Sequence, residues 1–117
     1  MRKSLLLFFA LLPFLAGVDG CVKHADYNVS VRSSIVQYGC PTCHVIPGVP
    51  GAVGKVGPSL ESLGQRSYLA GRLTNNPANL QLWMMHPQKF EPGVAMPEMG
   101  VTPEDGRRIA SFLEQSR

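Results

Sequence analysis

Two cysteines and a histidine lie close together in the stretch GCPTCH, as Cys40, Cys43 and His44. Thiols can bind a metal, pair in a disulfide, exchange with other thiols or be alkylated, and an imidazole can bind a metal. A Gly/Pro-rich segment follows at residues 45–58. The C-x-x-C-H spacing therefore marks the part of the chain where chemistry is expected.

Four kinds of site compete for this motif. A thioredoxin-type redox pair requires a preceding strand within a β-α-β pattern, which the sequence does not show. A structural zinc site needs four ligands, but there is no second cysteine pair and His24 and His86 are isolated. A purely structural disulfide stays open. The pattern favours haem attachment, in which Cys40 and Cys43 form thioethers to the haem and His44 binds the iron.

The N-terminus has the pattern of an export signal. Arg2 and Lys3 precede the apolar run SLLLFFALLPFLAGV, which is shorter than a membrane span of roughly 20 residues. We therefore predict that residues 1–20 are a signal peptide, that residues 21–30 are a short tether, and that residues 31–117 are the folded domain. The protein is expected in the periplasm.

Cys21 follows the apolar run directly, in the sequence VDGC. This sequence resembles the lipobox of bacterial lipoproteins, in which the cysteine is lipidated, although Asp19 departs from the small uncharged residue usual there. Lipidation accounts for the odd cysteine and predicts a membrane-surface anchor. The alternative is ordinary cleavage near LAGV, which leaves Cys21 as a thiol or a dimer bridge.

Size and charge exclude several partners and folds. Without residues 1–20 the chain has nine basic and seven acidic side chains, so its formal charge falls from +3 to +2 and nucleic acid is not an expected partner. The 117 residues include 12 Gly and 10 Pro, which predicts many loops. Such a small domain usually needs a disulfide, a metal or a prosthetic group for stability.

Three helices are predicted by their apolar spacing and caps. Residues 29–39 form the first, with Val31, Ile35 and Tyr38 on one face and Gly39 at its end. The second begins at the cap Asn76, with an apolar face made of Leu80, Trp83 and Met84. The third begins at the cap Thr102 and has an apolar face made of Ile109, Phe112 and Leu113. No strand pattern is evident, so we predict an all-α fold of three to four short helices with long loops.

The chain from residue 31 to 114 resembles small bacterial class I c-type cytochromes. The resemblance is carried by YGCPTCHVIPG, VGPSLESLGQRSYLAGRL, NNPANLQLWMMHPQKFEPGVAMPEMGVT and PEDGRRIASFL, in this order. It implies the cytochrome c fold around one covalently attached haem c. One departure is Arg32, which stands where the family often has a glycine at the crossing with the C-terminal helix; Ser33 or Ser34 is the substitute we expect.

The resemblance also implies the roles of individual residues. In addition to Cys40, Cys43 and His44, the residues that match cofactor contacts are Pro58, whose neighbouring carbonyl accepts the imidazole N–H, Arg66 and Tyr68 as propionate partners, Trp83 beside the haem, and Met96 as the distal iron ligand. Met99 and His86 compete with Met96 for the last role. Pro97 favours an extended backbone at Met96, which supports Met96.

A haem with imidazole and thioether ligands has no open position for a substrate and transfers single electrons. We therefore predict a monomeric electron carrier, not an enzyme, that shuttles electrons between respiratory redox partners. Two alternatives stay open. One is an accessory subunit of a respiratory complex, and the other is a five-coordinate haem protein that binds ligands or catalyses a reaction.

Overall fold

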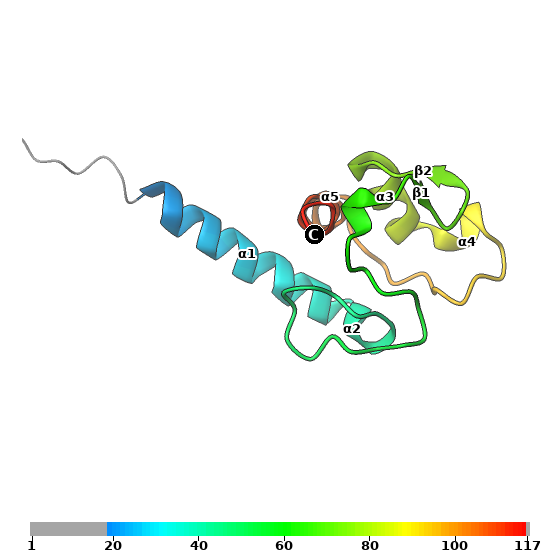
Figure 1. The fold of residues 1–117 in the computed structure, drawn as a ribbon, viewed down its shortest axis with the longest axis horizontal. Helices are drawn as coiled ribbons and strands as arrows, with labels where there is room; N and C mark the ends of the chain where they lie inside the picture. Colours follow the sequence, from blue (N-terminus) through cyan, green and yellow to red (C-terminus); the bar gives the residue numbers. More distant parts are fainter. Residues whose placement is uncertain (1–18, 117) are drawn as a thin grey trace, which may run out of the picture.

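The computed structural model describes residues 19–116, and it is mostly helical (Figure 1). The predicted signal peptide lies outside the described residues up to position 18. Five helices and one 3-10 turn follow one another with a two-stranded sheet between them: α1 (Asp19–Gln37), α2 (Cys40–Cys43), η1 (Leu63–Gln65), β1 (Tyr68–Leu69), β2 (Leu73–Thr74), α3 (Pro77–Met85), α4 (Pro87–Phe90) and α5 (Pro103–Glu114).

Helix α1 is longer than the helix predicted at residues 29–39. It begins at Asp19, so the segment predicted as a tether is helical, and it extends away from the other elements in Figure 1. The extra turns were missed because residues 23–27 are exposed and carry no apolar periodicity. The helix ends at Gln37, and Gly39 soon after it has a φ of 75°, in the left-handed region that favours glycine. Within residues 19–116, no helix combines the length and the apolar character needed to cross a membrane.

Both predicted helix caps are confirmed. The Asn76 side chain accepts a hydrogen bond from the Asn79 N–H at 2.8 Å, which caps α3. The Thr102 hydroxyl accepts one from the Asp105 N–H at 3.2 Å, which caps α5. Each helix also has proline at its first position, where no N–H is needed. Local sequence therefore fixes where these two helices begin.

The core lies where α1 and α3 pack against α5. Val31 and Ile35 of α1 are completely buried, as predicted. The predicted faces of the other two helices supply Leu80, Met84, Ile109 and Leu113, each at most 6% exposed, while Trp83 and Phe112 are half-buried. Burying such side chains contributes about 1.5–3 kcal/mol each. The apolar spacing in the sequence thus identified the packed faces.

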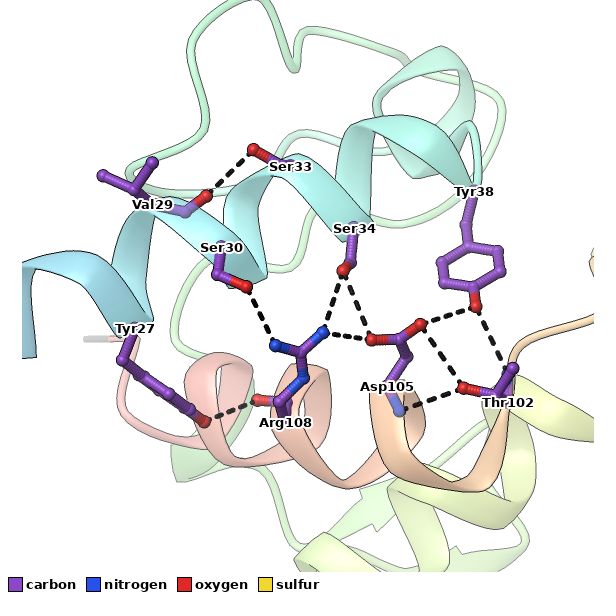
Figure 2. A network of polar contacts seen from close by, with 9 residues as sticks. All are labelled: Tyr27, Val29, Ser30, Ser33, Ser34, Tyr38, Thr102, Asp105 and Arg108. Atoms are coloured by element: carbon purple, nitrogen blue, oxygen red, sulfur yellow. Dashed lines mark hydrogen bonds and ion pairs between the residues drawn. The ribbon is translucent and has the colours of Figure 1, made fainter.

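A polar network joins α1 to α5 at their crossing (Figure 2). Ser34, 9% exposed, donates a hydrogen bond to Asp105 and accepts one from Arg108. Tyr38 donates to the Asp105 carboxylate at 2.8 Å, and Arg108 forms an ion pair with the same carboxylate. The small side chain of Ser34 therefore lies at the crossing where the cytochrome resemblance implies a glycine. Arg32 lies to one side, with its guanidinium 5.8 Å from the Phe112 ring centroid.

This network predicts acid-sensitive stability. The hydrogen bond from Arg108, followed by that from Tyr38, lowers the pKa of Asp105 from its ordinary value of 3.8. Because the folded pKa is the lower one, the stabilisation is present above the unfolded pKa and is lost as the pH falls through the folded pKa. We expect Asp105→Asn to lower the free energy of unfolding at pH 7 by about 1–3 kcal/mol, since Arg108 and Tyr38 lose a charged partner.

Urea unfolding at pH 7 and pH 3 measures this effect, and Glu104→Gln in the same first turn of α5 is the control. The difference between Asp105→Asn and the wild type is expected to shrink at pH 3. An equal loss of stability at both pH values would contradict the assignment to the carboxylate.

The small sheet was not predicted from the sequence. Strands β1 and β2 pair antiparallel, with Tyr68 opposite Thr74 and Leu69 opposite Leu73. Ala70 and Gly71, in the turn between them, have φ values of 48° and 69°. Strands of two residues are too short to show an alternating pattern, so the expectation of no strand was wrong for this hairpin.

Candidate functional site

A cavity of about 580 Å³ lies between the cysteine motif, the hairpin, α3 and the loop that precedes α5. Its volume is that of a small-molecule or cofactor site. All eight residues that the sequence predicts at a cofactor line this cavity: Cys40, Cys43, His44, Pro58, Arg66, Tyr68, Trp83 and Met96. Most of the other lining residues are apolar, including Ile46, Leu60, Leu63, Leu80 and Met84.

Helix α2 presents the cysteine motif to the cavity. It is a single turn that starts after Gly39 and ends where the His44 N–H donates to the Cys40 carbonyl at 3.1 Å. Cys40 and Cys43 are half-buried free thiols. Because one helical turn brings residues i and i+3 to the same side, both sulfur atoms are available to one group in the cavity.

The Gly/Pro-rich loop folds back onto the motif and orients the His44 ring. The Gly57 N–H donates to the Cys43 carbonyl at 2.7 Å, and the His44 Nδ1–H donates to the Pro58 carbonyl at 2.7 Å. A Cβ at Gly57 would stand 2.3 Å from His44 Cε1, so the ring lies directly against this glycine. The hydrogen bond fixes the tautomer and leaves Nε2 as the acceptor for a ligand or metal.

The environment of Cys40 disfavours thiol exchange. Burial, with a smaller contribution from the neighbouring Cys43, raises the pKa of the Cys40 thiol above its ordinary value of 9.0. Reactive redox thiols have a lowered pKa, because the thiolate is the attacking form. The thioredoxin-type alternative therefore has no support in the described residues.

Two methionines of the loop before α5 line the cavity, Met96 and Met99. Met96 also packs against the buried core. His86, the competing ligand, is not among the lining residues, and its half-exposed ring lies 3.6 Å from Glu98. Both methionines of this loop are therefore placed to be the distal ligand, and Met96 is the residue predicted for this role.

Arg66 and Tyr68 both line the cavity. Arg66 donates to the carbonyls of Ser59 at 2.6 Å and Glu61 at 3.0 Å, so its guanidinium braces the segment after Pro58. Tyr68 is 61% exposed. Their roles toward a cofactor stay predictions.

Two contributors to the site were not among the residues predicted for it. Met99 was considered only as a competitor of Met96, and it also lines the cavity. Gln88 of α4 was not singled out, although its side chain binds the backbone of the Met96 loop. An isolated glutamine has no motif that would reveal such a role, whereas a second methionine in the same loop was a visible signal.

Comparison with known proteins found a respiratory relative. The chain is 31% identical over 83 residues to cytochrome c oxidase subunit 2 of Alkalihalophilus pseudofirmus, which covers 70% of this chain and 23% of that protein. The chain thus spans less than a quarter of the length of the relative. No family model matches the sequence, and no solved structure matches it. The similarity is distant and covers only part of the relative, and it suggests a role in respiratory electron transfer.

The same comparison corrects the predicted cofactor. We expected a haem c attached through Cys40 and Cys43, but the relative is a subunit of the oxidase of cytochrome c rather than a cytochrome c. In addition, the part of the chain that the structure describes contains no group of three or more His, Cys, Asp or Glu side chains that could hold a metal ion. Haem c is therefore not part of the function that we propose.

Proposed function

We propose that the chain is an exported single-electron carrier whose redox cofactor binds in the 580 Å³ cavity. One observation carries the proposal: Cys40, Cys43 and His44 converge with Met96, more than 50 residues along the chain, on the same apolar space. The sulfur atoms of Cys40 and Cys43 would hold the cofactor, and His44 and Met96 would be its metal ligands.

The residues around the cavity suit electron transfer more than catalysis. His44 is fixed by the Pro58 carbonyl, so its ring has little freedom to reorient when the charge of the cofactor changes. Buried apolar side chains such as Leu80 and Met84 line the cavity. A thioether is a soft ligand that favours the reduced state of a redox metal. Among the described residues that line the cavity there is no His, Asp or Glu besides His44 that could be a general acid or base.

The proposal also includes the helix arrangement and the cellular location of the protein. We infer that α1, α3 and α5 adopt the arrangement that class I c-type cytochromes share. This inference concerns the fold of the polypeptide and not the identity of the cofactor. We also infer a monomer in the periplasm, held at the membrane surface by lipid on Cys21. Its partners would be respiratory proteins that donate and accept electrons.

A second function is favoured by the similarity to an oxidase subunit. In this case the chain would work as a subunit or accessory domain of a respiratory oxidase. A free carrier exchanges electrons as a purified monomer, whereas a subunit co-purifies with the oxidase through detergent extraction.

The proposed function is tested on the purified exported protein. We expect a visible absorption that changes reversibly with the applied potential and follows a one-electron Nernst curve. Metal analysis and the spectrum identify the cofactor, and an intense Soret band would show that it is a porphyrin. A protein without any reversible redox change would refute the carrier function.

A further inference from the structure

The loop that carries Met96 has few bonds of its own. From residue 95 to 101, within the described part of the chain, no backbone group takes part in a backbone–backbone hydrogen bond. Pro97 has no N–H, and Gly93 and Gly100 have φ values of 84° and 69°, so regular structure cannot form there. Something other than the loop backbone must therefore hold Met96 in place.

One side chain supplies this support. Gln88 lies in the short helix α4, and its amide N–H₂ donates to the carbonyls of Val94 at 2.7 Å and Met96 at 2.9 Å. Its amide oxygen accepts a hydrogen bond from the Gly93 N–H at 3.0 Å. Gln88 thus uses both donors and its acceptor on three backbone groups of the same loop, one of them the carbonyl of Met96 itself.

Met96 packs against the core, but the charged side-chain pairs of the loop act farther from Met96. Arg72 of the hairpin forms an ion pair with Glu91 at the start of the loop, and both side chains are substantially exposed. His86 lies 3.6 Å from Glu98, and this pair is about half exposed. Exposed pairs contribute little to stability because water and salt screen them. The half-buried Gln88 amide is the stronger restraint on the position of the Met96 backbone.

We propose that Gln88 is a positioning residue that fixes the loop so that the Met96 thioether faces the cavity. The inference rests on the proposed function, because it assigns Gln88 to the redox site through Met96. Without the amide, the loop would sample other conformations and the thioether would spend less time at the metal. The oxidised state would then be favoured, since a soft sulfur ligand stabilises the reduced state.

The structure offers a matched control for a merely structural role. Gln81 of α3 donates to the Pro103 carbonyl at 2.9 Å, at the start of α5. It is the same residue type with a similar bond to a backbone carbonyl, but it does not contact the Met96 loop. Gln88→Met and Gln81→Met remove the amide and keep a side chain of similar length. Gln88→Glu is a second variant, which keeps an acceptor for Gly93 but places a carboxylate against two carbonyls.

The test measures hydrogen exchange and the midpoint potential of the purified protein, for the wild type and these variants. In Gln88→Met we expect the Gly93 amide to exchange about tenfold faster or more, as for the loss of a hydrogen bond of ordinary strength. Gln88→Glu keeps the acceptor for Gly93, so we expect a smaller change of the exchange rate in this variant. In both Gln88 variants we expect a midpoint potential below those of the wild type and Gln81→Met. Equal exchange at Gly93 and equal potentials in Gln88→Met and Gln81→Met would overturn the proposal.

The two proposals fail in different ways. A wild-type protein without a redox couple refutes the electron-carrier function before any variant is compared. In that case the exchange rate of Gly93 in the Gln88 and Gln81 variants still decides whether Gln88 fixes the loop. An unchanged exchange rate together with a normal wild-type couple refutes only the role of Gln88.

Discussion

Met96→Ala is expected to lower the midpoint potential and change the visible spectrum, while Met99→Ala leaves both close to those of the wild type. Both methionines line the cavity, so the structure makes them direct competitors. Met96 packs against the core, and the Gln88 amide binds its carbonyl at 2.9 Å. Met99 precedes Gly100, whose φ of 69° turns the chain toward the start of α5. Met96 is therefore the better-restrained sulfur.

Potentiometric titration with spectral readout separates the outcomes of this experiment. Loss of the soft thioether removes a ligand that stabilises the reduced metal, which gives the expected direction of the shift. The reverse pattern in the two variants would assign the ligand role to Met99. If neither variant changed the potential, the metal would have no methionine ligand, and the ligand-binding alternative would gain support.

The sequence was most informative where a physical rule acts locally. Asn76 and Thr102 were identified as caps because a polar side chain before a proline satisfies the first free N–H groups of a helix. Val31 and Ile35 were identified as core because helical spacing places them on one face. Such rules need only neighbouring residues, so one sequence is enough to apply them.

Features that depend on tertiary contacts were less predictable. In α1, residues 23–27 are exposed and mostly polar, and the hairpin pairs only two residues from each strand. The bonds of Gln88 to the Met96 loop join α4 to a segment with no regular structure. None of these features has a periodicity or a motif. The identity of the cofactor was also not predictable from local sequence. The C-x-x-C-H spacing suggested haem c, and the similarity to an oxidase subunit opposes this prediction.

Replacing both Cys40 and Cys43 by alanine is expected to remove the cofactor and most of the folded protein. The cavity of about 580 Å³ adjoins core residues such as Leu80 and Ile109, so an empty cavity would leave their side chains without contacts. At roughly 24 cal/mol per Å³, an upper bound for this partly open space is about 14 kcal/mol. That is comparable to the whole stability of a small domain, about 5–15 kcal/mol.

Circular dichroism, protease resistance and metal content measure this loss in the exported protein. Thr42→Ala is the matched control, because it changes α2 between the two cysteines and its side chain is exposed. We expect the control to keep its cofactor and its helical content, while the double variant loses its metal and is degraded severalfold faster. A double variant that stayed folded and kept a full complement of metal would show that neither sulfur holds the cofactor. The site would then depend on His44 and Met96 alone, and the cysteine pair would be a structural element of α2.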